Sequence, residues 1–270
     1  AKISKKKGIK TINSFFTYQN VNKLKKYKKN TDIISAANVI CHVPDLIDLI
    51  RGIDCLLNRD GLFIFEEPYL GAMYKKTSYD QIYDEHIFMF SVNSIKKIFE
   101  LYSFDLIDVL PQKTHGGSMR YVIGRSGIHK INKNVATHLR YEKKNKIDSI
   151  QGCLKFKKKC ETSKIKLKRK IESILKKGKK IAGYAATSKS TTILNYCGIN
   201  SKHIKFICDT TPSKINTFSP GTHIPIVSVD YFKKNIPDYT FLFAWNHKKE
   251  IFKKEKKNLN KTKWFAHIAI

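Results

Sequence analysis

The segment KKIAGYAATSKSTTILNYCGI, residues 179 to 199, combines the signs of a strand, a loop and a helix. The apolar run at residues 181 to 185 predicts a buried strand, and the polar residues after it predict a loop. The helix that follows is expected to end at Gly198, because glycine commonly terminates helices. A strand that leads through a short loop into a helix is typical of α/β proteins.

The rest of the C-terminal part repeats this alternation. Strands are expected at HIKFICD (203–209), YTFLFAW (239–245) and KWFAHIAI (263–270), and helices at residues 229–236 and 247–259. Helices between strands supply the long crossovers that parallel pairing needs. Residues 181–270 are therefore predicted to form an α/β domain with a parallel sheet and right-handed crossovers.

The N-terminal part shows the same pattern. Strands are expected at IKTI (9–12), TDIISA (31–36) and LFIFEEPYL (62–70), with helices at residues 21–29 and at 46–57, the second one stopping at Asn58 to Gly61. A later helix starts at Ser91 or Ser94, because serine is a favoured N-cap, and MRYVIGR (119–125) is a further strand. Residues 1–128 are thus predicted to form a second parallel α/β sheet, and the charged residues 129–180 a helical connector.

The net charge of +30 is extreme for 270 residues. Such a charge attracts nucleic acid, anionic lipid or phosphorylated ligands. However, only six of the 52 basic residues are Arg, the residue that nucleic-acid readers favour for bidentate contacts. The lysines are scattered along the chain and no nucleic-acid-binding motif is present, so we favour biased composition and expect no nucleic-acid partner.

Cysteine usage and hydropathy indicate a cytoplasmic protein. The six cysteines form no CxxC pair, which favours reduced thiols over disulfides or a zinc cluster, and we expect no metal. No apolar run reaches the ~18 residues of a membrane span. The basic start AKISKKKGIK lacks the apolar core of a signal peptide, so we expect no membrane association.

The loop GYAATSKST, residues 183 to 191, has the spacing of a phosphate-binding Walker A loop. Ser188 stands where that loop requires its second glycine, which argues against an NTPase. Polar residues at a helix N-terminus can still hold an anion. Lys189, Ser188 and Ser190 are therefore candidate phosphate ligands, although the same residues could simply cap the helix.

Three other segments carry chemically capable side chains. DQIYDEHIFMFS (80–91) places Tyr83, Glu85 and His86 beside apolar residues, where polar groups are costly to bury unless they are paired. SAANVICHVPD (35–45) puts Asn38 and His42 beyond the end of a strand, where α/β sheets bind ligands. THGGSMRY (114–121) adds a histidine next to two glycines. Each segment alone is equally compatible with a structural role.

Together the segments resemble a known family. GIKTINSFF, AANVICHVPDLIDLIRGIDCLLNRDGLFIFEEPYL, TSYDQIYDEHIFMFS, THGGSMRY, GYAATSKSTTILNYCGI and PGTHIPI resemble, in this order, the motifs of S-adenosylmethionine-dependent sugar C-methyltransferases. The resemblance implies a partial class I methyltransferase (Rossmann-like) domain and a C-terminal Rossmann-like α/β domain that helps to hold a nucleotide sugar. It also implies methyl transfer to a sugar carbon beside a keto group.

The sequence departs from the family pattern at its start. It has no counterpart of the cysteine-rich zinc module, or of the first methyltransferase strand with its Gly-rich cofactor loop. We therefore expect a fragment, a truncated reading frame or a protein completed by another chain.

The resemblance also implies roles for individual residues. It makes His86 the base, since an imidazole titrates near neutral pH, with Tyr83, Glu85 and His42 as further catalytic residues. It implies cofactor binding by Phe15, Ala37 and Asn38. It implies contact with the nucleotide-linked deoxysugar by Tyr184, Ser188, Lys189, Ser190, His115, Gly116, Gly117 and Ser118.

Other functions stay open at this stage. A non-catalytic remnant could bind a sugar nucleotide without S-adenosylmethionine. An NAD-dependent oxidoreductase could use Asp209 for the cofactor ribose, although no GxGxxG precedes that residue. A nucleic-acid-binding protein would show steeply salt-dependent binding. The particular sugar, nucleotide and oligomeric state are not predicted.

Overall fold

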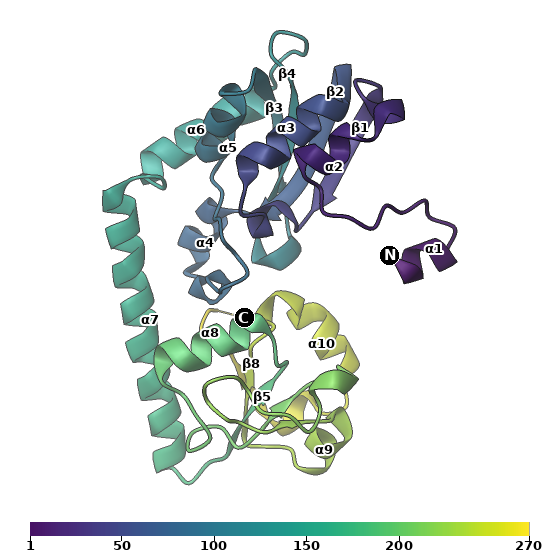
Figure 1. Ribbon diagram of the computed structural model, residues 1–270. Helices are drawn as coiled ribbons and strands as arrows, with labels where there is room; N and C mark the ends of the chain where they lie inside the picture. The colour runs from purple at the N-terminus through teal and green to yellow at the C-terminus, as the bar shows by residue number, and fades with distance from the viewer. Residues whose placement is uncertain (270) are drawn as a thin grey trace. The chain divides into compact units, whose positions relative to one another are not determined.

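The computed structural model describes residues 1–269, so Ile270, the last residue of the expected strand 263–270, lies outside the described residues. The chain divides into two compact units, which are described separately (Figure 1). The first comprises Ala1–Glu67, Ile87–Gln112 and Ser118–Lys144; the second comprises Pro68–His86, Lys113–Gly117 and Asn145–Ile270. The chain therefore passes between the units several times, whereas the sequence predicted simple boundaries near residues 128 and 180.

The first unit contains a four-stranded sheet with the order β1-β2-β4-β3. Its strands are β1 (Thr31–Ala37), β2 (Leu57–Pro68), β3 (Phe104–Gln112) and β4 (Ser118–Arg125). β1 and β2 are parallel, as predicted, but β3 and β4 are antiparallel neighbours. The short connection between β3 and β4 explains this, because a parallel pair needs a crossover of a dozen or more residues. The sheet is therefore mixed.

The helices of the first unit are α1 (Lys2–Lys6), α2 (Tyr18–Asn22), α3 (Leu46–Leu56), α5 (Val92–Glu100) and α6 (Lys133–Asn145), with short 3-10 turns η1 (Lys25–Tyr27) and η2 (Ile40–His42). Ser91 caps α5, and the side chain of Ser94 reaches back to the N-cap, so both serines named in the sequence form one capping box. The predicted start of α5 is confirmed.

A buried carboxylate joins two of these helices. Glu142 of α6 is 1% exposed, and its oxygens accept hydrogen bonds from the N–H groups of Val92 at 2.6 Å and Asn93 at 2.9 Å. These amides lie in the first turn of α5, where backbone donors lack helical partners and the helix dipole favours negative charge. Glu142 therefore stabilises the packing of α6 on the start of α5.

Other expectations for the first unit are also wrong. The helix expected at residues 21–29 is replaced by α2, which ends at Asn22, and the 3-10 turn η1. Residues 9–12 form no strand, and Ile9 and Ile12 are exposed. The strand expected from residue 62 already starts at Leu57, directly after α3 ends at Leu56, so Asn58 to Gly61 belong to β2. Leu57 pairs with Thr31 and Leu62 with Ile33, so pairing with β1 includes these residues in the strand through a shift in register. Local β propensity does not create a strand without a partner, and turn-forming residues do not prevent one that has a partner.

The second unit contains a five-stranded sheet with the order β7-β6-β5-β8-β9. Its strands are β5 (Ile181–Tyr184), β6 (Ile207–Cys208), β7 (Ile226–Val227), β8 (Tyr239–Leu242) and β9 (Lys263–Phe265). Every pairing in it is parallel, as predicted. No strand was predicted at β7, which has two residues, and β6 and β9 are shorter than the apolar runs that predicted them.

The helices of the second unit are α4 (Leu70–Lys76), α7 (Ile150–Lys176), α8 (Ser188–Cys197), α9 (Val229–Lys234) and α10 (Lys248–Lys254). Short 3-10 turns are η3 (Tyr79–Gln81), η4 (Thr114–Gly116), η5 (Pro212–Lys214), η6 (Trp245–His247) and η7 (Leu259–Lys261). α8 ends at Gly198, which has the left-handed conformation that favours glycine. The predicted order of strand, loop and helix over residues 181–198 is confirmed.

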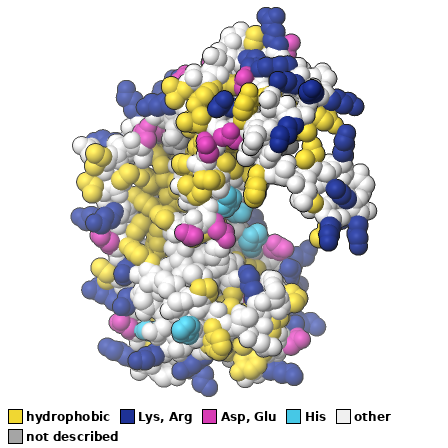
Figure 2. Space-filling view, viewed as in Figure 1, with side chains coloured by type: hydrophobic (Ala, Val, Ile, Leu, Met, Phe, Trp, Pro, Cys, Tyr) yellow, Lys and Arg dark blue, Asp and Glu magenta, His cyan; other side chains and the backbone are white. Residues whose placement is uncertain are grey.

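The sequence analysis also made expectations about charge, cysteines and membrane spans. Figure 2 shows Lys and Arg side chains spread over the visible face, with hydrophobic side chains gathered beside α7. All six cysteines are free, and Cys153 is the exposed one. Among the described residues, no helix is both long and apolar enough to cross a membrane.

Candidate active site

A cavity of about 810 Å³ lies in the first unit, at the C-terminal end of β1. Its lining comes from the segment before α2, the end of β1, the loop that leads into α3, α3 itself and β2. Phe15, Ala37, Asn38 and His42 all line it. The three residues predicted to bind the cofactor and one of the predicted catalytic residues thus share one cavity. Ligand sites of α/β sheets are expected at this position.

Asn38 gives this cavity an unusual polar group. Its backbone is left-handed, with φ 54°, and its N–H donates to the carbonyl oxygen of Glu66 at 2.9 Å. Its side-chain Oδ1 is buried without a hydrogen-bond partner among the described residues. A buried acceptor without a donor is costly, so the site suits a ligand that brings an N–H or O–H group.

The chemistry of this cavity fits S-adenosylmethionine. Its walls are mostly apolar, with Ile34, Leu49, Ile53 and Phe63 among them, which suits an adenine ring. Asn38 supplies an acceptor for an amino or hydroxyl group of such a ligand. Asp48, which also lines the cavity, accepts a hydrogen bond from the N–H of Tyr18 at 2.9 Å.

Glu67 fixes the loop that carries His42. This residue at the end of β2 is fully buried, and its Oε1 accepts from the N–H groups of Val39 at 2.9 Å and Ile40 at 2.6 Å. Burial raises the pKa of Cys41, and hydrogen bonding to Glu67 raises it further, so the thiol stays protonated. The loop is thereby tied to β2 through one carboxylate. A glutamate at the end of an apolar strand was visible in the sequence, but its role was missed.

In the second unit, His86 is oriented by the backbone. Its Nδ1 lies 2.8 Å from the carbonyl oxygen of Gln81. A carbonyl oxygen can only accept, so the proton is on Nδ1, and Nε2 is the nitrogen that can take up another proton. The ring also contacts the ring of Tyr83, with centroids 4.0 Å apart. Gln81 was not predicted as a site residue.

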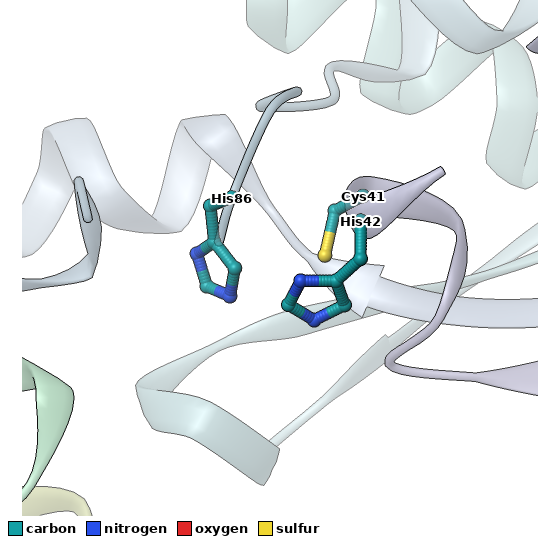
Figure 3. Close-up of side chains that lie close together, drawn as sticks. All are labelled: Cys41, His42 and His86. Atoms are coloured by element: carbon teal, nitrogen blue, oxygen red, sulfur yellow. The ribbon is translucent and has the colours of Figure 1, made fainter. Parts of the chain in front are cut away.

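The chain leads from His86 directly into the first unit. Figure 3 draws His86 together with Cys41 and His42. The next residue, Ile87, belongs to the first unit, where its N–H donates to the carbonyl oxygen of Cys41 at 3.0 Å. Phe88 donates to the same oxygen at 3.2 Å. Two hydrogen bonds therefore hold the segment after His86 to the loop of the first cavity.

Tyr83 lines a cavity of its own unit. This cavity measures about 780 Å³, and its walls come from α4, η3, α7 and α8. Tyr74 and Phe156 stack in it, with ring centroids 4.5 Å apart. Glu85, the third member of the predicted group, is exposed.

Comparison of the chain with known protein families gives two matches. The model described as C-methyltransferase C-terminal domain matches residues 113–268, which is more than half of the chain. The chain belongs to this C-methyltransferase family. A model described as methyltransferase domain matches residues 3–109.

A similar protein agrees with this assignment. The C-methyltransferase NovU of Streptomyces niveus is 30% identical over 260 residues, which is 96% of this chain and 62% of NovU. The chain thus spans less than two thirds of the length of that relative. Among solved structures, the crystal structure of PH0226 protein from Pyrococcus horikoshii OT3 covers 46% of this chain and 64% of its own, at 15% identity and a TM-score of 0.34.

The loop before α8 is engaged in local contacts. Ser190 and Thr187 form a capping box, and Ser188 is exposed. Lys189 is 8% exposed; its Nζ donates to Asn246 Oδ1 at 3.2 Å and to the carbonyl oxygen of His115 at 3.4 Å. Burial lowers the pKa of Lys189. Lys189 and Ser190, two of the three predicted phosphate ligands, therefore already have protein partners.

The other predicted substrate residues have varied positions. Tyr184 is buried in the core of the second unit, and its hydroxyl donates to Glu255 Oε1 at 2.9 Å. His115 lies in η4 with φ 50°, and Gly116 and Gly117 follow with positive φ. A Cβ on Gly116 would lie 2.1 Å from Trp245, so this glycine permits a close approach of the indole ring. Ser118 is buried at the start of β4.

A buried polar group of the second unit was missed altogether. Asp80 accepts from Trp245 Nε1 at 2.7 Å and lies 3.2 Å from His267 Nε2, and the side chains of Asp80 and His267 are fully buried. Lys189 Nζ lies 4.9 Å from the centroid of the Trp245 ring. These residues are far apart in the sequence, so no local pattern could have revealed the group.

Proposed function

We propose that the protein acts in S-adenosylmethionine-dependent C-methylation of a nucleotide-linked keto-deoxysugar, with His86 as the base. Membership of the C-methyltransferase family supports the reaction class. The single observation that carries the residue assignment is the hydrogen bond between His86 Nδ1 and the Gln81 carbonyl oxygen. With the proton on Nδ1, Nε2 is the atom that we propose accepts the proton.

The step that needs this base is removal of a proton from carbon. A C–H bond beside a ketone is acidic enough for a side-chain base because the resulting negative charge spreads into the carbonyl oxygen. Imidazole suits this task because its ordinary pKa lies near neutrality. His86 Nε2 takes the proton, and the electrons of the broken C–H bond form the enolate.

Tyr83 is the proposed partner for the charge that develops on oxygen. Its ring contacts the His86 ring, and its position in the wall of the second-unit cavity gives its hydroxyl access to a ligand there. A hydroxyl that donates to an enolate oxygen lowers the barrier most when it is held in place beforehand. His42, in the wall of the first-unit cavity, and Glu85 are further proposed catalytic residues.

The first-unit cavity is the proposed position of the cofactor, with Asn38, Ala37 and Phe15 in its wall. Bound S-adenosylmethionine would supply an electrophilic methyl group to a carbon nucleophile. The residues that line this cavity bind the cofactor, and their apolar side chains exclude water from it.

The direct test is methyl transfer. The protein is incubated with S-adenosylmethionine carrying an isotopic methyl label and with nucleotide-linked keto-deoxysugars, and the sugars are analysed by mass spectrometry. We expect one labelled methyl group on the carbon beside the ketone. Label on a sugar oxygen, or on no sugar under conditions where both ligands bind, would contradict the proposal.

A second function is favoured by one observation. β1 is the edge strand of the described four-stranded sheet. The sheet therefore continues on only one side of the cofactor cavity at the end of β1. A protein that binds a sugar nucleotide without catalysis would share this feature. Calorimetry separates the two functions: the enzyme binds S-adenosylmethionine and the nucleotide sugar, whereas the binding protein binds the sugar alone.

A further inference from the structure

The 3-10 turn η3 lies directly before the segment that carries His86. All three residues of the turn are buried, and η3 packs against α8. The segment after the turn comes to the surface, where Ile82 and Glu85 are exposed. His86 Nδ1 contacts the carbonyl oxygen of Gln81, the last residue of η3. The position of this oxygen therefore depends on the contacts that hold η3 in place.

Asp80, the middle residue of η3, holds the turn through a buried hydrogen bond. Its side chain is fully buried, and its Oδ2 accepts from Trp245 Nε1 at 2.7 Å. Trp245 belongs to η6, lies 165 residues later in the chain and is 8% exposed. An indole N–H can only donate and a carboxylate can only accept, so each group satisfies the other. Loss of either partner would leave a buried polar group unpaired, which is costly.

Asp80 has further neighbours from two other parts of the second unit. His267 Nε2, after β9, lies 3.2 Å from Asp80 Oδ1, and the His267 ring packs edge-on against Tyr79 with centroids 5.2 Å apart. Burial lowers the pKa of Lys189 of α8, and the negative charge of Asp80 opposes this effect. Lys189 Nζ also lies 4.9 Å from the centroid of the Trp245 ring. Side chains from α8, η6 and the segment after β9 thus meet at η3.

Gln81 connects this anchored turn to His86. Its side chain is buried and donates from Nε2 to Ser78 Oγ at 2.9 Å, and its carbonyl oxygen lies 2.8 Å from His86 Nδ1. The His86 N–H donates to the carbonyl oxygen of Tyr83 at 2.9 Å. Because Asp80 and Gln81 are neighbours in one 3-10 turn, a shift of Asp80 also moves the Gln81 carbonyl oxygen. The His86 ring then loses the acceptor that keeps its proton on Nδ1.

The loss of this acceptor has a defined chemical result. A neutral histidine that is free in water favours the tautomer with its proton on Nε2. In that tautomer Nε2 of His86 cannot take up a proton, so the atom proposed as the base would be blocked. The contact with the Gln81 carbonyl oxygen therefore selects the tautomer that the reaction needs.

We propose that Asp80 is a positioning residue for His86. By holding Trp245 it fixes η3, and through the Gln81 carbonyl oxygen it keeps the His86 proton on Nδ1. Asp80 is fully buried, so it acts through the turn and not by contact with a substrate. The consequence for catalysis rests on the proposed function, whereas the effect on the imidazole ring does not.

Nitrogen NMR of the His86 ring tests this role without any substrate. The protein is labelled in its histidines and measured at a pH where His86 is neutral, and the signals that disappear in His86→Asn identify the ring. In the unaltered protein we expect the proton on Nδ1. Trp245→Phe deletes the indole N–H and keeps an aromatic ring. This variant should move a large part of the population to the tautomer with the proton on Nε2.

Three further variants separate the hydrogen bond from a general loss of stability. Asp80→Ala should act like Trp245→Phe, whereas Asp80→Asn keeps an oxygen that can accept from Trp245 and should keep the proton on Nδ1. Thr240→Val is the control, because it removes another buried hydrogen bond of the second unit, between Thr240 and Thr262 at 2.9 Å. An unchanged tautomer in Trp245→Phe, or an equal change in Thr240→Val, would overturn the proposal. So would an Asp80→Asn variant that behaves like Asp80→Ala.

Deuterium exchange measures the consequence for catalysis. The same variants are incubated in heavy water with a nucleotide-linked keto-deoxysugar, and exchange at the carbon beside the ketone is followed by NMR. We expect Trp245→Phe to lower kcat of this exchange about tenfold or more, with a smaller change in KM. A raised KM with unchanged kcat would overturn the positioning role. A protein whose His86 tautomer responds as expected, but which exchanges no deuterium, would refute the proposed function and leave the role of Asp80 intact.

Discussion

His86 Nδ1 lies 2.8 Å from the carbonyl oxygen of Gln81, five residues earlier in the chain. This contact determines which ring nitrogen carries the proton, because a carbonyl oxygen cannot donate. Gln81 is itself fixed, since its Nε2 donates to Ser78 Oγ at 2.9 Å and its side chain is buried. The ring of the proposed base is therefore oriented by the backbone of a short, well-anchored 3-10 turn.

Replacement of Glu67 should destabilise the first unit. Glu67→Ala removes the acceptor of two buried N–H groups, and each unsatisfied donor costs about 1–3 kcal/mol. We expect a loss of about 3 kcal/mol in the free energy of unfolding, measured with urea. Glu67→Gln keeps an acceptor oxygen and should lose clearly less. Similar losses in both variants would mean that the negative charge of Glu67, rather than an acceptor oxygen at this place, makes the residue important.

The thiols should differ strongly in reactivity. Cys153 is exposed, whereas burial and the nearby charge of Glu161 raise the pKa of Cys160 to about 11, and burial raises that of Cys208 to about 12. The thiolate is the reactive form, so an aromatic disulfide reagent at pH 8 should modify Cys153 in the folded protein and the buried thiols only after unfolding. Cys153→Ser should abolish the fast phase. A fast phase that persists in this variant would contradict the burial of the other thiols.

Asp54 should make stability depend on pH. Burial opposes ionisation of this carboxyl, but ion pairs with Arg125 at 2.6 Å and Lys29 at 3.0 Å outweigh it and hold the pKa of Asp54 below its ordinary value. Its contribution is therefore fully present above the unfolded-state pKa and is lost as pH falls through the lower folded-state value. Urea unfolding should show that Asp54→Asn destabilises the protein at pH 6 and that the difference shrinks towards pH 2. A difference independent of pH would show that ionisation of Asp54 is not involved.

Local patterns in the sequence were sufficient to predict much of the fold. β1, α3 and the segment from β5 to α8 were predicted because each combines an apolar period with a cap or a stop such as Gly198. The extension of β2 through Asn58 to Gly61 was not, since it depends on pairing with β1, which no local pattern contains. The same reason applies to the antiparallel pairing of β3 and β4.

In the candidate site, too, residues within one local segment were predicted, whereas residues with distant partners were not. Asn38 and His42 were found because they follow a strand end within one loop, and they share one cavity. Glu67, Asp80 and His267 were missed because their partners are distant in the sequence: Asp80, for example, contacts Trp245 and His267. Such contacts are created by the fold, and a single sequence carries no sign of them.

The central claim is that His86 removes a proton from the carbon beside the ketone, and deuterium exchange tests it without any methyl transfer. The protein is incubated in heavy water with a nucleotide-linked keto-deoxysugar, without S-adenosylmethionine, and the sugar is analysed by NMR. We predict that the unaltered protein incorporates deuterium at the carbon next to the ketone, and that His86→Asn slows this exchange by about a hundredfold or more while nucleotide-sugar affinity stays unchanged. Equal exchange rates for the two proteins would contradict the claim.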